Sequence, residues 1–273
     1  MSRPSETKEP RSAVAQDQTH PVYVYGIMAA ADGDSWPAMP GLGDPRSPVR
    51  TVAEGGIAAL VSDLAPDHTP GRLEDLEAHR RVLAQAIKVG TAIPMRFGTV
   101  MDSDEVVRSR LLERHAPELS DVLRTLDGHI QMTVKAFYAD DALVGDVLAT
   151  QPDLARQAAA LAEHPGPEMR TERVRFGELL AKAVEARRAE VESALLARLS
   201  ALVSDVRVEP ASSDRVAFSA HLLVHRDRRA ALDDAIRELG DTLDGVLAFR
   251  YIGPLPPFSF ADLSLEDGDD QWD

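Results

Sequence analysis

HIQMTVKAFYA, residues 129–139, reads as a strand that begins directly after a boundary at Asp127–Gly128. Helices are predicted after it, at 141–149, at 152–163 and at 172–204. Two strands, a helix and a closing strand follow, within residues 206–212, 215–227, 228–243 and 245–253. The order strand, helices, strand, strand, helix, strand predicts a ferredoxin-like domain over 128–253, with extra helices in its first crossover.

The longest of these helices, 172–204, carries an apolar stripe at helical spacing. The stripe consists of Phe176, Leu180, Val184, Val191, Leu195, Leu199 and Leu202. A ferredoxin-like sheet needs helices on one face, so we expect the stripe to cover that sheet. Docking of a partner on the stripe is the alternative.

Residues 21–127 are expected to form a separate, smaller α+β domain, which makes the whole chain an α+β protein of two domains. A strand at 21–28 precedes a hairpin at 51–64, whose Gly55–Gly56 turn supplies positive φ angles. Gly90 is placed to end a helix whose apolar face is Leu73, Leu76, Val82, Leu83, Ala86 and Ile87. A further helix is expected from a cap at Asp102 or Ser103 to about Leu126.

TAIPMRFGTVM, residues 91–101, lies between those two helices, and its apolar positions suit a strand returning into the first sheet. Pro94 indicates an edge strand or the start of a strand, because proline cannot donate to a central ladder. Gly98 fits a bend and lacks the companions of a phosphate-binding loop. Two roles stay open for Arg96, an ion pair with a helix carboxylate such as Glu77 or contact with a partner.

Near the end of the sequence, YIGPLPPFSF (251–260) places three prolines within four residues, which forces an extended segment. Phe258 and Phe260 are two residues apart, so both are expected to point the same way. Such a strap either clamps the chain across a groove or offers itself to another protein, and we favour the clamp because two exposed Phe side chains are an apolar liability. Residues 254–273 therefore comprise a Pro/Phe strap and a tail whose last twelve residues hold six acids and no base.

Composition narrows the class of protein. The chain has 273 residues, of which 44% are apolar and 27% charged, as in a soluble globular protein. Its net charge of −15 disfavours nucleic acid as a partner, since such binding is driven by cationic side chains. No apolar run approaches a membrane span or a signal-peptide core, so no membrane partner and a cytoplasmic location are expected. Residues 1–20 are polar and aperiodic and are predicted to form a disordered arm.

No catalytic, metal-binding or cofactor-binding constellation is found in the sequence. A dinucleotide-binding fingerprint, a P-loop and a GxSxG elbow are all missing, and there is no cysteine. His221 and His225 have tempting spacing for a metal, but are expected on the wetter face of their strand. His79 is expected to be a solvent-side or satisfied helix histidine. The enzymatic alternative requires a pocket formed around His79, Arg96 and Glu77.

Several stretches, taken in order, resemble the gas vesicle accessory proteins of the GvpF/GvpL family. They are YVYGIM, GGIAALVSDL, LEAHRRVL followed by TAIPMRFGTVM, HIQMTVKAFY, RFGELLAKAVEARR and GPLPPFSFADL. The resemblance covers residues 21–263. It does not distinguish an F-type from an L-type member.

The resemblance implies a non-enzymatic protein with an α+β N-terminal domain and a modified ferredoxin-like C-terminal domain. Its implied partners are the small hydrophobic gas vesicle shell protein and other accessory proteins, and its implied location is the gas vesicle in the cytoplasm. Edge strands and the groove between the domains are the expected binding surfaces. Candidate partner-binding residues are Arg96, Phe97, Phe258 and Phe260.

Overall fold

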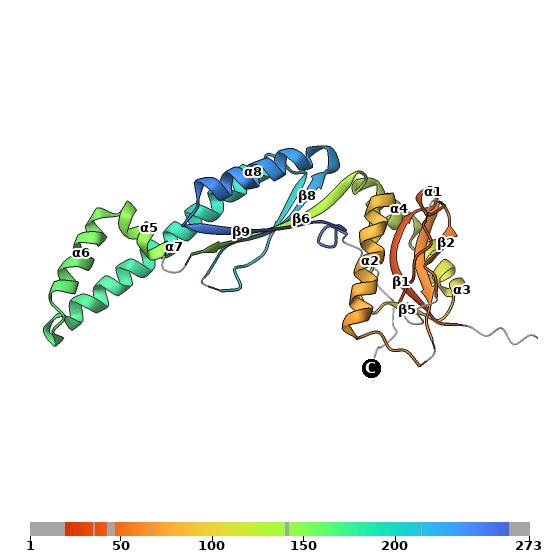
Figure 1. Cartoon of the computed structure of the whole chain (residues 1–273), viewed down its shortest axis with the longest axis horizontal. Coiled ribbons are helices and arrows are strands. Elements are labelled where there is room, and N and C mark those ends of the chain that lie inside the picture. The colour runs from red at the N-terminus through yellow and green to blue at the C-terminus, as the bar shows by residue number, and fades with distance from the viewer. Residues whose placement is uncertain are drawn as a thin grey trace, which may run out of the picture.

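The protein is a mixed helix-and-sheet structure with two antiparallel sheets set along an elongated molecule (Figure 1). The computed structural model describes residues 20–34, 36–42, 47–65, 67–139, 142–213 and 215–261. The predicted disordered arm, apart from residue 20, and the acidic residues 262–273 lie outside these ranges. The expectations for those segments therefore stay predictions.

The first sheet has the strand order β2-β3-β1-β4, and β5 also pairs with β1. Its strands are β1 (Val22–Ala29), β2 (Arg50–Glu54), β3 (Ile57–Asp63), β4 (Ala92–Pro94) and β5 (Val100–Met101). A short helix, α1 (Ala30–Gly33), follows β1. The hairpin predicted at Gly55–Gly56 is confirmed between β2 and β3, where the two glycines have φ angles of 57° and 88°. Two consecutive positive φ angles are what a two-residue hairpin turn requires.

This sheet is covered on both faces. One face packs on α2 (Leu73–Val89), and the other on the π-helical turn η1 (Val107–Glu113), which follows the short α3 (Asp104–Val106), and on α4 (Ala116–Thr125). Seven of the eight residues of β1 are buried, which matches its nearly continuous apolar sequence VYVYGIMA. A strand buried on both faces needs no alternation of polar and apolar residues.

The segment 91–101 returns to the first sheet as predicted, but as two short strands separated by a bend. Pro94 lies in β4, at the edge of the strand order, which confirms the prediction from its missing N–H group. Gly98 has a φ of 95°, so the predicted bend is also confirmed. β4 and β5 both pair with β1.

The single helix predicted from 102 to 126 is wrong, because the structure divides it at residues 114 and 115. Its cap is as expected, since Ser103 accepts a hydrogen bond from the Val106 amide at 3.3 Å. Pro117 stands in the first turn of α4. A proline fits there because the first amides of a helix have no partner within it, so Pro117 favours a new helix start over continuation.

The second sheet has the strand order β7-β8-β6-β9, with every neighbouring pair antiparallel. Its strands are β6 (His129–Tyr138), β7 (Asp205–Val208), β8 (Val216–His225) and β9 (Leu247–Leu255). Its helices are α5 (Ala142–Thr150), α6 (Pro152–Glu163), α7 (Arg170–Ser200) and α8 (Arg229–Thr242), with the short turns η2 (Pro167–Met169) and η3 (Arg226–Arg228). β9 runs beyond the predicted boundary at residue 253, so the Pro/Phe strap begins inside a strand.

The stripe of α7 covers the sheet over only part of its length, which corrects the expectation for this helix. Leu195 and Leu199, near its end, are buried in the core of the second sheet. The earlier part extends past the sheet and packs on α5 and α6 instead (Figure 1). A helix of 31 residues is about 46 Å long, more than a four-stranded sheet can cover.

Polar contacts join the two sheets near residues 127 and 128. The Thr91 hydroxyl donates to Asp127 at 3.2 Å, and the Gly128 amide donates to the Thr91 oxygen at 3.3 Å. The Arg226 guanidinium donates to the carbonyl of Ile87 at 2.5 Å, at the end of α2. A cation suits that position because the last carbonyls of a helix are unpaired and partly negative. The end of α2 is thus fixed to the second sheet.

Candidate functional site

A groove of about 290 Å³ lies between α2 and the Pro-Phe strap, which we define as residues 254–261. The lining residues are Glu77, Arg80, Arg81, Leu83 and Ala84 from α2, and Pro254, Leu255, Pro256 and Phe258 from the strap. The α2 residues recur at helical spacing and so form one side of the helix. The groove therefore combines apolar lining with three charged side chains.

The strap turns sharply, which corrects the expectation that Phe258 and Phe260 point the same way. The amides of Phe260 and Ala261 both donate to the Pro257 carbonyl at 3.0 Å. This turn separates the two side chains, because the alternation of side chains applies only to extended backbone. Phe258 is 45% exposed beside the groove, whereas Phe260 is only 8% exposed.

Phe260 anchors the strap between the two sheets. Its side chain belongs to the apolar cluster on the α4 face of the first sheet, together with Leu223 of β8. The Arg207 guanidinium lies 5.1 Å from the centre of the Phe260 ring, within cation–π range. The neighbouring Ser259 amide donates to the Gln131 side chain at 2.9 Å. These contacts make the strap the clamp favoured from the sequence.

The buried side of α2 holds a hydrogen-bonded relay. The Gly98 amide donates to the Tyr23 hydroxyl oxygen at 3.1 Å, and that hydroxyl lies 2.9 Å from Nδ1 of His79. Which of Tyr23 and His79 donates in this contact depends on the imidazole tautomer. Within the described ranges Nε2 has no hydrogen-bond partner. The relay links the β4–β5 bend to β1 and α2.

The relay residues are poorly placed for proton transfer. Burial lowers the pKa of His79 to about 4, so its imidazole is neutral at physiological pH. Burial also raises the pKa of Tyr23 well above its usual range. His79 is 2% exposed, so the expectation of a solvent-side histidine is wrong, while the alternative of a satisfied helix histidine holds only for Nδ1.

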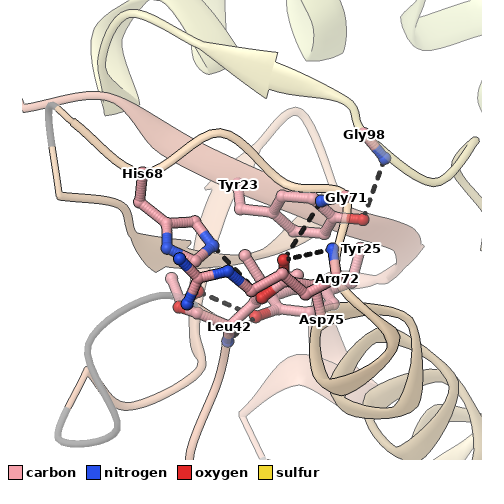
Figure 2. Close-up of polar contacts among 9 residues, drawn as sticks. Tyr23, Tyr25, Leu42, His68, Gly71, Arg72, Asp75 and Gly98 are labelled. Carbon is pink, nitrogen blue, oxygen red and sulfur yellow. Dashed lines mark hydrogen bonds and ion pairs between the residues drawn. The ribbon is translucent and has the colours of Figure 1, made fainter.

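A second polar group fixes the beginning of α2, as Figure 2 shows. The Asp75 carboxylate accepts hydrogen bonds from the amides of Gly71 and Arg72 at 3.1 and 3.0 Å, and lies 3.1 Å from His68. Burial alone would raise the pKa of Asp75, but these amide hydrogen bonds and His68 outweigh burial and lower it. A carboxylate that caps the first turn of a helix in this way has a structural role.

The four residues proposed from the sequence lie in different environments. Arg96 is exposed and forms no ion pair with any described residue, including Glu77. Phe97 is half-buried, with its ring centre 5.7 Å from that of His79. Phe258 lies on the groove, and Phe260 is buried in the clamp. Of the three residues needed for an enzymatic pocket, only Glu77 lines the groove, so His79 and Arg96 are not brought together in it.

The sequence reasoning missed two features. The prediction that Leu73 and Leu76 lie on the buried apolar face of α2 is wrong, because they are 72% and 38% exposed, one helical turn before Glu77 and Arg80. The buried face instead follows Asp75, Ala78, His79, Val82, Leu83, Ala86 and Ile87, which is a regular helical series. Asp75 and His79 are polar, so they interrupt the apolar pattern by which the series would be recognised in the sequence. Their burial is explained only by the hydrogen bonds that they form.

Glu209 is the centre of the other missed feature, a polar cluster on the second sheet. Its carboxylate accepts from the Ser219 hydroxyl at 2.7 Å, lies 3.0 Å from His221 and 3.2 Å from the Lys135 ammonium. The Ser219 hydrogen bond, followed by Lys135 and His221, lowers the pKa of Glu209 to about 2. The cluster confirms that His221 lies on the wetter face of β8. Among the described residues no group of three potential metal ligands occurs.

Comparison with known proteins gives a consistent result. Residues 21–262 match the family model described as gas vesicle synthesis protein GvpL/GvpF. Gas vesicle protein F of a Streptomyces species is 37% identical over 88% of this chain and 99% of its own length. Gas vesicle protein F of Dolichospermum flosaquae is 22% identical over 89% of this chain and 98% of its own.

Solved structures give the same fold. The crystal structure of GvpF from Anabaena superposes with a TM-score of 0.76 at 24% identity, covering 90% of this chain and 99% of the other. That of GvpF from Microcystis aeruginosa superposes with a TM-score of 0.69 at 22% identity, over 90% and 100% of the two chains. Within the described residues, no helix combines the length and hydropathy of a membrane span.

Proposed function

This chain belongs to the GvpL/GvpF family of gas vesicle synthesis proteins, and from that premise we propose that it is a non-enzymatic assembly protein that binds the hydrophobic gas vesicle shell protein. Its family gives it a role in gas vesicle formation. The observation that carries the proposal is the extent of the family match, which spans both sheets and the strap. We place its action at the gas vesicle, in the cytoplasm.

We further interpret the chain as two domains, residues 21–127 and 128–253. The second domain is ferredoxin-like, with α5, α6 and the early part of α7 as an insertion. The strand order β7-β8-β6-β9 supports this interpretation, since a βαββαβ unit places its strands in the order second, third, first, fourth. The second sheet and its helices also form an apolar cluster of their own, although Leu223 of β8 belongs to the cluster of the first sheet.

The proposed binding surface is the groove with the apolar residues beside it. Phe258, Leu73 and Leu76 are exposed large apolar side chains on the strap and on α2. Exposed apolar side chains that lie together on a surface mark interaction sites, whereas single exposed apolar side chains are ordinary. Arg96 and Phe97 are further candidates, as are the edge strands β2 and β7, which have unpaired backbone groups on one side.

The physical role proposed is to keep an apolar subunit from aggregating before it assembles. A shell subunit with an apolar gas-facing surface exposes that surface while it is free, and covering it removes the driving force for aggregation. The net charge of −15 suits this role, because strongly charged proteins repel one another and stay soluble. Other accessory proteins of the gas vesicle are additional proposed partners.

The absence of catalysis is part of the proposal. It is supported by the polar side chains around α2, which form structural hydrogen bonds. His79 is bonded to Tyr23, and Asp75 to backbone amides. A general base needs access to a substrate proton, and the buried His79 imidazole has none.

Two experiments test the proposal. Deletion of the gene from a gas vesicle gene cluster should abolish or deform vesicles in electron micrographs. In a pull-down with the shell protein, Leu76→Ser combined with Phe258→Ser should weaken binding about tenfold or more, since buried apolar anchors dominate interfaces. Val174→Ser with Leu179→Ser, two exposed apolar residues on α7, is the matched control. Normal vesicles after deletion, together with no binding of the shell protein, would refute the proposed function.

A further inference from the structure

The exposed side of α2, counted with its N-cap Arg72, carries four basic residues against two acidic ones, Glu74 and Glu77, although the protein as a whole is strongly acidic. Arg72, Arg80, Arg81 and Lys88 are exposed, and none of them forms an ion pair with a described residue. Arg80 and Arg81 line the groove, where Glu77 is the one acidic residue of the lining. An acidic ligand would therefore find unpaired cationic partners at this groove.

The groove also favours an apolar ligand. Leu83, Ala84, Pro254, Leu255 and Phe258 form most of its lining, and nearly half of the Phe258 side chain surface is open to solvent. A segment that combines carboxylates with large apolar side chains fits both properties. A purely acidic segment would leave the apolar lining uncovered.

Residues 262–273, DLSLEDGDDQWD, have this combination. They hold six acidic residues and no basic one, together with Leu263, Leu265 and Trp272. They follow Ala261, whose amide donates to the Pro257 carbonyl at 3.0 Å, so the segment starts next to the strap that lines the groove. Twelve extended residues reach about 40 Å, and α2, with its 17 residues, is about 26 Å long. The segment can therefore reach any part of the groove and of the exposed side of α2.

We infer that residues 262–273 bind back onto this groove, with their carboxylates paired to Arg80 and Arg81 and their apolar side chains covering Phe258. Because the segment is covalently attached close to the groove, weak contacts are sufficient for it to bind there. The effective concentration of a segment on such a tether is on the order of 1 mM, so a groove with a Kd of about 1 mM is half occupied. The segment is then an internal ligand that a partner must displace. The inference concerns the chain alone and does not depend on the identity of any partner.

Trp272 provides the test, because the chain has only one other tryptophan, Trp36. The fluorescence of Trp272 is the difference between the full chain and its Trp272→Phe variant. We expect acrylamide to quench this difference signal about twofold less than in a free peptide of residues 262–273, as half occupancy predicts. In 1 M NaCl, where the Debye length falls to about 3 Å, the protection should disappear.

Charge reversal locates the binding site. Arg80→Glu with Arg81→Glu should raise quenching of Trp272 to the level of the free peptide. Arg170→Glu with Arg175→Glu, two exposed arginines without ion pairs to described residues on α7, is the matched control and should leave the protection intact. Circular dichroism establishes that both variants are folded.

Three results would overturn the inference. The first is quenching of Trp272 in the intact chain equal to that in the peptide. The second is protection that survives the Arg80 and Arg81 reversal. The third is protection that grows with protein concentration, which would assign the contact to a second copy of the chain. The shell protein is not used, so failure here leaves the proposed assembly role untouched.

Discussion

The first sheet is enclosed on both faces, whereas the second is covered by helices on one face and carries a polar cluster on the other. In the first sheet, Ile27 and Met28 are neighbours in β1, point to opposite faces, and are both fully buried. In the second, Tyr251 of β9 packs towards the core while its neighbour Ile252 is 43% exposed. The first sheet therefore buries apolar side chains on both faces, whereas the second buries them mainly on one.

The difference explains where the polar groups are found. Between the first sheet and α2, the polar side chains of Tyr23 and His79 are enclosed, so each depends on a specific partner. In the second sheet, Glu209 and Lys135 are partly exposed and their interaction is shared with solvent. We therefore expect the first sheet to be the more sensitive to substitution and to change in protonation.

The largest expected effect is in the apolar residues of β1. Ile27→Ala and Met28→Ala should each lower the free energy of unfolding by about 2–5 kcal/mol, because each leaves a cavity in an enclosed face. Ile252→Ala, on the open side of β9, should change it by no more than about 0.5 kcal/mol. Urea denaturation measures all three. An equal loss for Ile252→Ala would mean that both sheets are enclosed.

The strap shows the same contrast, because Phe260 is buried and Phe258 is exposed. Phe260→Ala should cost about 3 kcal/mol, because it removes a buried ring and the contact with Arg207. Phe258→Ala should change the free energy of unfolding by less than about 0.5 kcal/mol, since its ring is half exposed. If the two substitutions were equally costly, Phe258 would be a structural residue rather than part of a binding surface.

The response to acid should reveal the enclosed histidine. His79 has a pKa of about 4 in the folded protein and about 6.5 in the unfolded chain, so below pH 6.5 the unfolded chain binds the extra proton. Stability should therefore fall as the pH drops from about 6.5 to 4. His79→Gln should flatten this part of the Tm curve and cost about 1 kcal/mol at pH 7. The exposed His164→Gln is the control, and a curve unchanged by His79→Gln would contradict the assignment.

Glu209 should give the smallest effect, at lower pH. Its pKa is about 2 in the folded protein and 4.5 in the unfolded chain, so its contribution is present above pH 4.5 and is lost as the pH falls towards 2. Because its side chain is 38% exposed, Glu209→Gln should cost less than about 1 kcal/mol at pH 7. Thermal unfolding from pH 5 to 2 measures this, with Glu192→Gln as the control. If Glu209→Gln lost stability more steeply than the parent protein as the pH falls, the lowered pKa assigned to Glu209 would be wrong.

Much of the fold could be predicted from local patterns. The Gly55–Gly56 hairpin, the edge position of Pro94, the bend at Gly98 and the Ser103 cap each depend on the covalent chemistry of one or two residues. Such properties act within a few residues and are visible in the sequence. The succession of strands and helices that forms the second sheet and its helices could also be predicted.

The candidate site was harder to predict, because its residues are brought together from distant segments. The apolar spacing of α2 predicts Leu73 and Leu76 in the core, but the helix turns Asp75 and His79 inward instead. An extended backbone predicts Phe258 and Phe260 on one side, but a turn at Pro257 separates their side chains. In both cases a hydrogen bond formed by folding outweighs the apolar pattern, since a buried polar group with a partner costs little.

Sequence alone is enough to recognise the family, the succession of strands and helices, and the acidic character of the protein, because periodicity, turn residues and charge are local or additive properties. Tertiary contacts set which side of α2 faces the sheet and how far α7 extends past its own sheet (Figure 1). They also form the groove between α2 and the strap, whose arginines have no ion pair with a described residue. Those features depend on contacts between residues far apart in the chain, such as Arg226 with Ile87 and Ser259 with Gln131, and no local pattern specifies such pairs.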